Sequence, residues 1–156
     1  MTTIHEVKTY LFGLGIEVWE YEQPTPNSVK AAEAVGCTPA EIAKTILFIV
    51  GGEPVAIVTS GDLKVNASKL KQATGIKGKA RLPDAGEVIQ HTGYAPGGVC
   101  PFLLPEGLRV LIDRSMRRFE TVYAAAGNDH SAVPITIDRL IEVTGGEEVD
   151  VCTALL

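Results

Sequence analysis

The chain has 156 residues, 46% of them hydrophobic and 21% charged, with a net charge of −5. This size and balance are typical of a globular protein with a proper core, so we expect a single domain over residues 1–156. The acidic net charge excludes indiscriminate nucleic-acid binding but allows a local basic patch. No apolar run reaches the roughly 20 residues that span a bilayer, and no signal-peptide pattern is present, so we expect no membrane partner and a cytoplasmic location.

Local signals predict the elements in chain order. Capping side chains and terminal glycines mark helices, and runs of β-branched and aromatic residues bounded by turns mark strands. In the first half these signals predict a helix over residues 4–14, a strand over 16–21, a helix over 29–35 capped by Ser28, one helical turn after Thr38, a buried strand over 44–50 and its hairpin partner over 54–60.

The second half alternates in the same way. The signals predict a helix capped by Asn66 and ended by Gly75, a short strand within 77–82, a helix from Asp84 to about His91, strands over 108–112, 121–125 and 133–137, a helix from Asp138 to Thr144 and a last strand near 149–151. Helices interspersed with hairpin-type strands predict an α+β fold, with a mixed, partly barrel-like β-sheet and flanking helices.

The stretch TGYAPGGVCP, residues 92–101, is the most distinctive part of the chain. Gly97 and Gly98 allow close approach to the backbone, while Pro96 and Pro101 stiffen the loop. Such a turn can present N–H groups to a carbonyl oxygen, an oxyanion or a phosphate. An ordinary tight connection has the same composition, so the loop alone leaves both interpretations open.

Lys44 lies between a short helical turn and a continuous apolar strand. A lysine at the rim of the core can reach a cleft and bind a phosphate, carboxylate or carbonyl oxygen as a point charge. The spacing also fits a surface lysine whose stem covers apolar residues.

Basic residues gather in one window that contains no Asp or Glu. This window predicts contact with a nucleic-acid backbone, although a solvated helix face can carry similar charges. Its members are Lys64, Lys69, Lys71, Lys77, Lys79 and Arg81.

The remaining chemistry-bearing side chains form no recognised motif. The three histidines and three cysteines lack metal-ligand spacing, so we expect no metal site. Cys100 could act as a nucleophile with His91 or His130, but a cysteine between Val99 and Pro101 also fits a small apolar filler.

Six stretches in this order resemble the YbaK/prolyl-tRNA synthetase-associated domain family, the aminoacyl-tRNA deacylases. The resemblance covers nearly the whole chain. Its marks are PTPNSVKAA at residues 24–32, AKTILFIV at 43–50, SGDLKVNASKL at 60–70, TGYAPGGVCP at 92–101, the strand that ends in Asp113, and YAAAGN at 123–128.

The resemblance implies a free-standing editing enzyme that hydrolyses the ester between a mischarged amino acid and the 3′ end of tRNA, without metal or organic cofactor. It implies Lys44 as the key side chain, the loop from Gly97 to Pro101 as the holder of the aminoacyl carbonyl, and participation of the substrate's own ribose 2′-OH. The further positions that it places at the site are Tyr21, Ser28, Thr45, Cys100, Asp113 and Gly127.

The residues themselves fit this chemistry. An aminoacyl ester is already activated, so its hydrolysis needs a positioned water and stabilisation of the oxyanion. We expect the Gly98 and Val99 N–H groups to stabilise the oxyanion, Lys44 to anchor the terminal nucleotide and the basic window to hold the acceptor stem.

The amino acid that is removed stays open. Relatives that act on cysteinyl-tRNA(Pro) resemble this loop but have serine at the position of Cys100, so alanine or another small amino acid fits equally well. Prolyl-tRNA synthetase is a possible partner. The alternative is a non-catalytic tRNA- or synthetase-binding module of the same fold.

Overall fold

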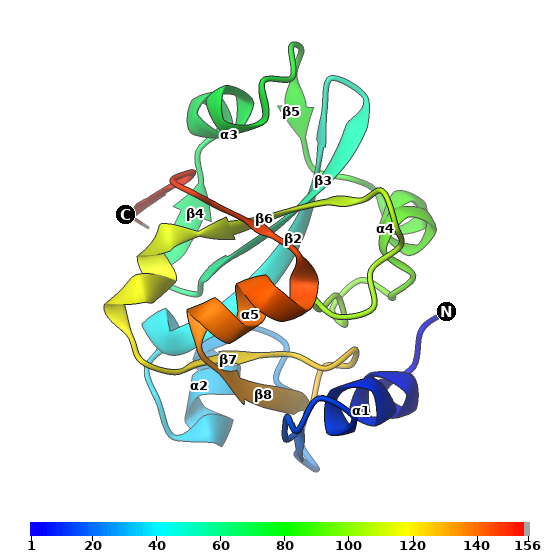
Figure 1. Ribbon diagram of the computed structural model, residues 1–156, viewed down its shortest axis with the longest axis vertical. Helices are drawn as coiled ribbons and strands as arrows, with labels where there is room; N and C mark the ends of the chain where they lie inside the picture. The colour runs from blue at the N-terminus through cyan, green and yellow to red at the C-terminus, as the bar shows by residue number, and fades with distance from the viewer. Residues whose placement is uncertain (155–156) are drawn as a thin grey trace.

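A computed structural model describes residues 1–154 of the chain (Figure 1). The helices are α1 (Ile4–Phe12), α2 (Ser28–Val35), α3 (Ala67–Thr74), α4 (Ala85–Thr92) and α5 (Ile137–Thr144), with 3₁₀ helices η1 (Pro39–Glu41) and η2 (Arg114–Arg118). The strands are β1 (Trp19–Glu20), β2 (Ile42–Val50), β3 (Glu53–Ser60), β4 (Leu63–Val65), β5 (Ala80–Arg81), β6 (Arg109–Asp113), β7 (Val122–Ala124), β8 (Ser131–Ile135), β9 (Glu147–Val149) and β10 (Cys152–Ala154).

The strands form a large mixed sheet and a small ribbon. The large sheet has the order β1-β8-β7-β2-β3-β6-β9, and β5 joins β2 off this path. The pairings β2–β7, β3–β6 and β6–β9 are parallel, whereas the other pairings are antiparallel. The ribbon pairs β4 with β10, which lie far apart in sequence.

One edge of β2 is only partly covered. The partner β3 runs antiparallel along β2, from the pair Ala43–Ser60 to the pair Val50–Glu53. On the opposite edge, β7 pairs with residues 42–43 and β5 pairs with residues 49–50. In the part of the chain that the structure describes, no strand therefore pairs with this edge of β2 over residues 44–48.

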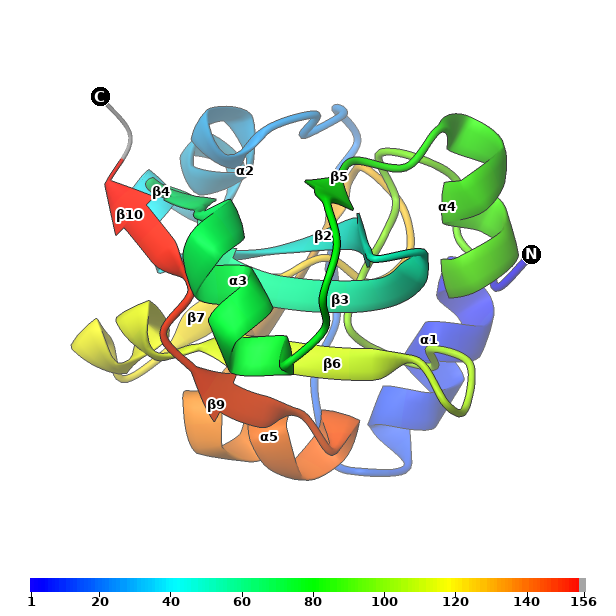
Figure 2. The ribbon, with the colours of Figure 1, turned by 90° about the horizontal axis from the view of Figure 1, so that it is seen from above.

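The register of β2 and β3 divides their side chains between two faces, because alternate residues of a strand point to opposite sides. Ala43 and Val58 belong to the larger core cluster, which also contains residues of α1 and α5. Val50 and Ile57 belong to a smaller cluster with Leu70 of α3. Figure 2 shows α3 in front of the sheet, near β3 and β10.

The structure confirms the predicted α+β fold with a large mixed sheet and five α-helices. The hairpin around residues 51–52 is confirmed, as is the helix between the Asn66 cap and Gly75. Both are set by residues close together in sequence, such as the Asn66 side chain that accepts a hydrogen bond from the Lys69 N–H.

Several predicted boundaries were wrong. The N-cap of α2 is Asn27 rather than Ser28, because the Asn27 side chain accepts a hydrogen bond from an N–H of the first turn. For the same reason, the N-cap of α5 is Thr136 rather than Asp138. The strand predicted over 16–21 shrinks to β1, where only two residues pair with β8. The last predicted strand begins earlier, as β9, and the short strand β4 was missed because its partner β10 lies far along the chain.

Candidate functional site

A cavity of about 510 Å³ opens beside the uncovered edge of β2. Four parts of the chain form its walls: the segment that leads into α2, the start of β2, the β7–β8 pair and the glycine-rich loop. Lys44, Thr45, Ser28, Gly97 and Val99 are five predicted site residues that line it. The fold therefore brings the lysine and the glycine-rich loop to one hollow, although they lie far apart in sequence.

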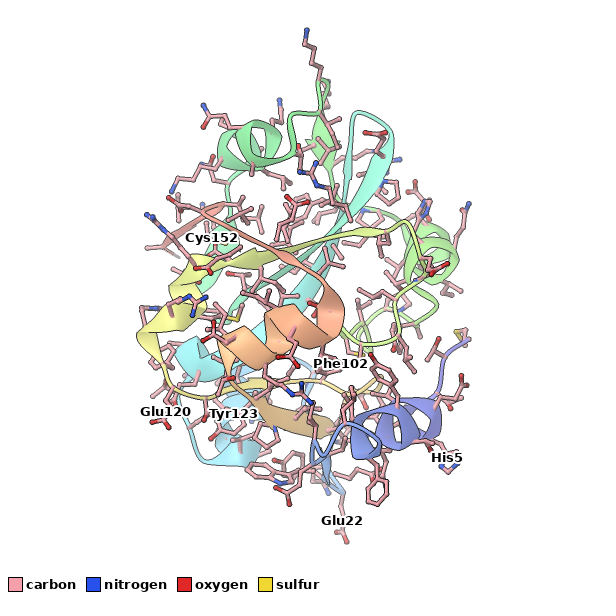
Figure 3. All side chains as sticks on the ribbon, viewed as in Figure 1. His5, Glu22, Phe102, Glu120, Tyr123 and Cys152 are labelled. Atoms are coloured by element: carbon pink, nitrogen blue, oxygen red, sulfur yellow. The ribbon has the colours of Figure 1, made fainter. Side chains whose placement is uncertain are left out.

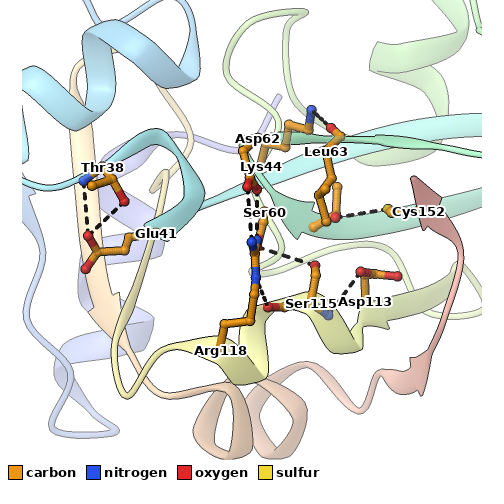
Figure 4. A network of polar contacts seen from close by, with 11 residues as sticks. Thr38, Glu41, Lys44, Ser60, Asp62, Leu63, Asp113, Ser115, Arg118 and Cys152 are labelled. Carbon is orange, nitrogen blue, oxygen red and sulfur yellow. Dashed lines mark hydrogen bonds and ion pairs between the residues drawn. The ribbon is translucent and has the colours of Figure 1, made fainter. Parts of the chain in front are cut away.

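Lys44 is partly buried, and its ammonium donates a hydrogen bond of 2.5 Å to the backbone carbonyl of Leu63. Burial lowers the pKa of Lys44, because removal from water disfavours the charged form. Cys152 and Asp62 oppose this effect and favour the ammonium. Figure 4 shows Lys44 beside Asp62 and Leu63. Lys44 thus lines the cavity, and its ammonium has a defined backbone partner.

Thr45 lies on the opposite face of β2 from Lys44, because successive residues of a strand point to opposite sides; its cross-strand partner is Val58. Its hydroxyl oxygen is buried, and within residues 1–154 it has no hydrogen-bond partner. Thr45 therefore contributes to the cavity wall without presenting a free hydroxyl at the surface of the cavity.

The glycine-rich loop presents two of its three central residues to the cavity. Gly97 has a φ of +88°, which favours glycine, and open space surrounds it. Gly98 is buried against the backbone of Gly127, and its N–H donates to the Ala95 carbonyl at 2.9 Å. The expected oxyanion donor at Gly98 is therefore already engaged in a turn. The Val99 N–H has no protein acceptor among residues 1–154, and Val99 lines the cavity.

Ser28 is the first residue of α2 and lies against the turn after β3. A Cβ added at Gly61 would be 2.6 Å from the Ser28 side chain and 2.4 Å from the Pro39 carbonyl oxygen. Only glycine allows α2 and this turn to approach so closely. Because Gly61 also lines the cavity, this contact fixes one of its walls.

Two predicted site residues perform structural tasks away from the cavity. Asp113 is 1% exposed, and its carboxylate accepts hydrogen bonds from the Ser115 and Val151 N–H groups. Cys100 is fully buried, and its thiol donates to the Phe102 carbonyl. Burial raises the pKa of Cys100 to about 11, so the thiol is protonated at neutral pH. Neither residue lines the cavity, which argues against Cys100 as a nucleophile.

Three more predicted residues do not line the cavity. Pro101 is buried beside Cys100, and Gly127 holds a φ of +102° where a Cβ would press on Tyr94. Tyr21 is partly buried, and its N–H donates to the His130 carbonyl at 2.8 Å.

The predicted basic window divides into paired and unpaired cations. Lys69 forms an ion pair with Asp150, and Arg81 binds Glu87 through two nitrogens. The exposed lysines of this window form no ion pair within residues 1–154; they are Lys64, Lys77 and Lys79. Lys71, on α3, is partly buried and likewise forms no ion pair there. None of the six residues lines the cavity.

The β7–β8 wall was largely missed by reasoning on individual residues. Tyr123, labelled in Figure 3, lines the cavity. Its ring lies 5.8 Å from the Trp19 ring, centroid to centroid. Ala124, Asn128 and Ser131 complete this side, and the Ser131 hydroxyl accepts the Ala126 N–H at 2.9 Å. The sequence feature that indicates this wall is the stretch YAAAGN at residues 123–128, in which small residues leave room for a ligand.

Residues 1–154 contain no group of three or more His, Cys, Asp or Glu side chains that could hold a metal ion. No helix among them has the length and apolar character needed to cross a membrane.

Known proteins resemble this chain over most of its length. The chain is 38% identical over 138 residues to the uncharacterised protein YwhH of Bacillus subtilis (strain 168), with 87% of each protein covered. It is 36% identical over 110 residues to the proline–tRNA ligase of Leuconostoc citreum (strain KM20), a match that covers 68% of this chain but only 18% of that enzyme.

Solved structures and family patterns agree with these matches. The fold matches a candidate trans-editing enzyme for prolyl-tRNA synthetase with a TM-score of 0.87 and 25% identity, over 97% of both chains. It matches the hypothetical protein APE2540 with a TM-score of 0.84 and 29% identity, over 94% of this chain and 99% of the other. The pattern of the aminoacyl-tRNA editing domain matches residues 22–143, and the chain therefore belongs to the aminoacyl-tRNA editing domain family.

Proposed function

We propose that this chain is a deacylase that hydrolyses the ester of tRNA mischarged with a small amino acid. The observation that carries the proposal is the shared cavity of Lys44 and the Gly97–Val99 turn. A cation and a free backbone N–H on the walls of one hollow suit an ester whose carbonyl oxygen gains negative charge during hydrolysis.

In the proposed reaction, the oxygen of a water molecule attacks the ester carbonyl carbon. The Val99 N–H, which has no protein acceptor among residues 1–154, stabilises the resulting oxyanion. The bond between this carbon and the ribose oxygen then breaks, and a proton from the water passes to that ribose oxygen. The products are the free amino acid and a tRNA with an intact 3′ end.

Lys44 has the properties needed to orient the substrate. Lys44 lines the cavity, and its ammonium would bind a phosphate or ribose oxygen of the terminal nucleotide. Fixing the nucleotide places the ester carbonyl near the loop, and such positioning accounts for a large share of catalysis in general.

The cavity walls include apolar side chains, which suit an uncharged amino-acid side chain. Ala43, Ala124, Ala125 and Ala132 line the cavity together with Val99. Pockets of this kind discriminate by size only modestly, by about 10–200-fold for one methylene, so alanine and cysteine are both suitable substrates.

The similarity to proline–tRNA ligases makes tRNA(Pro) the first tRNA to test. The acceptor stem would contact the exposed lysines of the basic window, because they are free to neutralise phosphates. Prolyl-tRNA synthetase is the protein partner that we propose.

The decisive experiment measures deacylation of tRNA(Pro) charged with Ala, Cys, Ser or Thr, with Pro-tRNA(Pro) as the control. We expect hydrolysis of Ala- or Cys-tRNA(Pro), and much slower hydrolysis of Pro-tRNA(Pro). Salt-sensitive tRNA binding without turnover on any of these substrates would instead support the non-catalytic binding module.

A further inference from the structure

Among the titratable groups that affect the pKa of Lys44, one is charged at neutral pH. Its ammonium binds the Leu63 carbonyl, and the neighbouring titratable groups are Asp62, from the turn between β3 and β4, and Cys152, from β10. Burial raises the pKa of Cys152 to about 11, so this thiol is neutral near pH 7. Asp62 is therefore the anion that faces the lysine.

Arg118 holds the Asp62 carboxylate in place. Two guanidinium nitrogens bind the two carboxylate oxygens at 2.8 and 3.1 Å, and Nε donates to the Ser115 carbonyl at 2.8 Å. The guanidinium also lies 5.1 Å from the centre of the Phe119 ring. Such a planar, two-point contact fixes the orientation of a carboxylate better than a single lysine can.

The turn that carries Asp62 is itself anchored on both sides. The Gly61 N–H donates to the Ile42 carbonyl at 2.8 Å, at the start of the strand that carries Lys44. The Ser115 hydroxyl reaches the Ser60 hydroxyl at 3.4 Å, on the side of η2 (Figure 4). Arg118 thus binds the carboxylate of Asp62, and the next residue, Leu63, carries the carbonyl that accepts a hydrogen bond from the Lys44 ammonium.

We propose that Asp62, oriented by Arg118, is a positioning residue that holds the Lys44 ammonium in place on the neighbouring Leu63 carbonyl. The inference rests on the proposed deacylase function and adds to it two residues that neither line the cavity nor touch the substrate. The Asp62–Arg118 pair is partly exposed, with side-chain exposures of 35% and 44%. Partly exposed ion pairs contribute little to the stability of a protein. A role in orienting the Asp62 carboxylate therefore explains this pair better than a role in stability does.

The electrostatic consequence has a definite sign. Burial lowers the pKa of Lys44, and Asp62 counteracts this effect. Removing the carboxylate therefore lowers the pKa of Lys44 further, and the ammonium loses its proton at a lower pH. A deacylation rate that depends on this ammonium should then decline at a lower pH on the alkaline side.

The test compares Asp62→Asn and Arg118→Gln with the matched control Arg117→Gln. Arg117 lies on the same 3₁₀ helix and forms similar ion pairs, but its partners are Glu148 and Asp138. We expect Asp62→Asn to lower kcat about tenfold with little change in KM and to move the alkaline decline to lower pH. Arg118→Gln should act in the same direction more weakly, Arg118→Lys should recover part of the loss, and Arg117→Gln should change neither quantity.

A second measurement keeps this inference separate from the proposed function. The rate of acetylation of Lys44 by acetic anhydride, followed by mass spectrometry across a pH series, reports its ionisation without any turnover. We expect Lys44 to become reactive at lower pH in Asp62→Asn than in the parent protein, whether or not the protein hydrolyses the chosen tRNA. An unchanged acetylation profile, or an equal change in Arg117→Gln, would overturn the role of Asp62. Absence of hydrolysis in the parent protein would overturn only the deacylase proposal.

Discussion

The two ends of β2 use positive charge in different ways. At the cavity end, Lys44 is partly buried and has a fixed carbonyl partner and one ionised neighbour. At the far end, Lys77 and Lys79 are exposed, and the segment that carries them contacts the hairpin turn through a Gly51 N–H to Lys79 carbonyl bond of 2.9 Å. A fixed cation can stabilise one arrangement of atoms, whereas mobile cations attract a polyanion without selecting a geometry.

This contrast predicts that changes at the cavity end alter the rate of hydrolysis, and that changes at the far end alter affinity and its dependence on salt. The experiments below separate the two effects.

The largest effect is expected for Lys44→Ala. Removing the ammonium should lower deacylation by about 100-fold or more, because a preorganised charge is lost from the site. The measurement is single-turnover hydrolysis of a mischarged tRNA(Pro), together with a thermal unfolding curve. Lys8→Ala, which removes an exposed lysine on α1 paired with Glu20, is the control and should retain the parent rate. Full activity in a folded Lys44→Ala protein would contradict the proposed site.

Gly61→Ala should damage both the rate and the stability. The new Cβ would meet the Pro39 carbonyl oxygen and the Ser28 side chain, so α2 and the turn after β3 must separate. Overpacking of this kind costs about 1–3 kcal/mol of unfolding free energy, which chemical denaturation measures.

The matched glycine for that experiment is Gly86, in the first turn of α4. An added Cβ there makes only an ordinary contact at 3.4 Å, with the Asp84 carboxylate. Gly86→Ala should stabilise the protein by about 0.5–1 kcal/mol, because alanine loses less conformational entropy in a helix. Equal stability changes at Gly61 and Gly86 would show that the close approach of α2 is unimportant.

The far end should respond through tRNA affinity. Replacing both Lys77 and Lys79 by alanine should reduce the slope of log Kd against log salt by about two units, if each lysine contacts one phosphate. Fluorescence anisotropy of labelled tRNA at several salt concentrations measures this slope. Arg81→Ala should change it less, because that guanidinium already binds Glu87. A double variant with an unchanged slope would place the acceptor stem elsewhere.

The smallest effect on activity is expected for Cys100→Ala. The thiol is buried, protonated at neutral pH and absent from the cavity wall, so the rate should stay within about twofold of the parent protein. The lost sulfur should reduce the unfolding free energy by about 1 kcal/mol. Alkylation of the native protein should leave Cys100 unmodified. A large loss of rate with the fold intact would restore the cysteine-nucleophile hypothesis.

Much of the fold was predictable because its signals are local. Asn66 and Gly75 delimit α3 through contacts within a few residues, and Gly51 with Gly52 allows the tight turn between β2 and β3. Boundaries failed where neighbouring residues of similar capping ability compete, as Asn27 does with Ser28. The pairing of β4 with β10 has no local signal, since each strand has only three residues.

The candidate site was predictable to a smaller extent. The order of the motifs identified Lys44 and the glycine-rich loop, both of which line the cavity. Spacing alone could not reveal that the Gly98 N–H bonds the Ala95 carbonyl, or that Asp113 points inward to the Val151 N–H. Both hydrogen bonds depend on the exact backbone path at one residue, which spacing in the sequence does not define.

By itself, the sequence determined the family, the α+β class and the residue types from which the site is built, since caps, turns and hydrophobic periodicity act over a few residues. Only the tertiary structure decided that β7 and β5 pair with opposite ends of one edge of β2 and leave the edge between them open. The tertiary structure likewise decided that Arg118 reaches Asp62 beside Lys44. The physical reason is that these contacts join segments distant in sequence, whose approach is fixed by packing of the whole core.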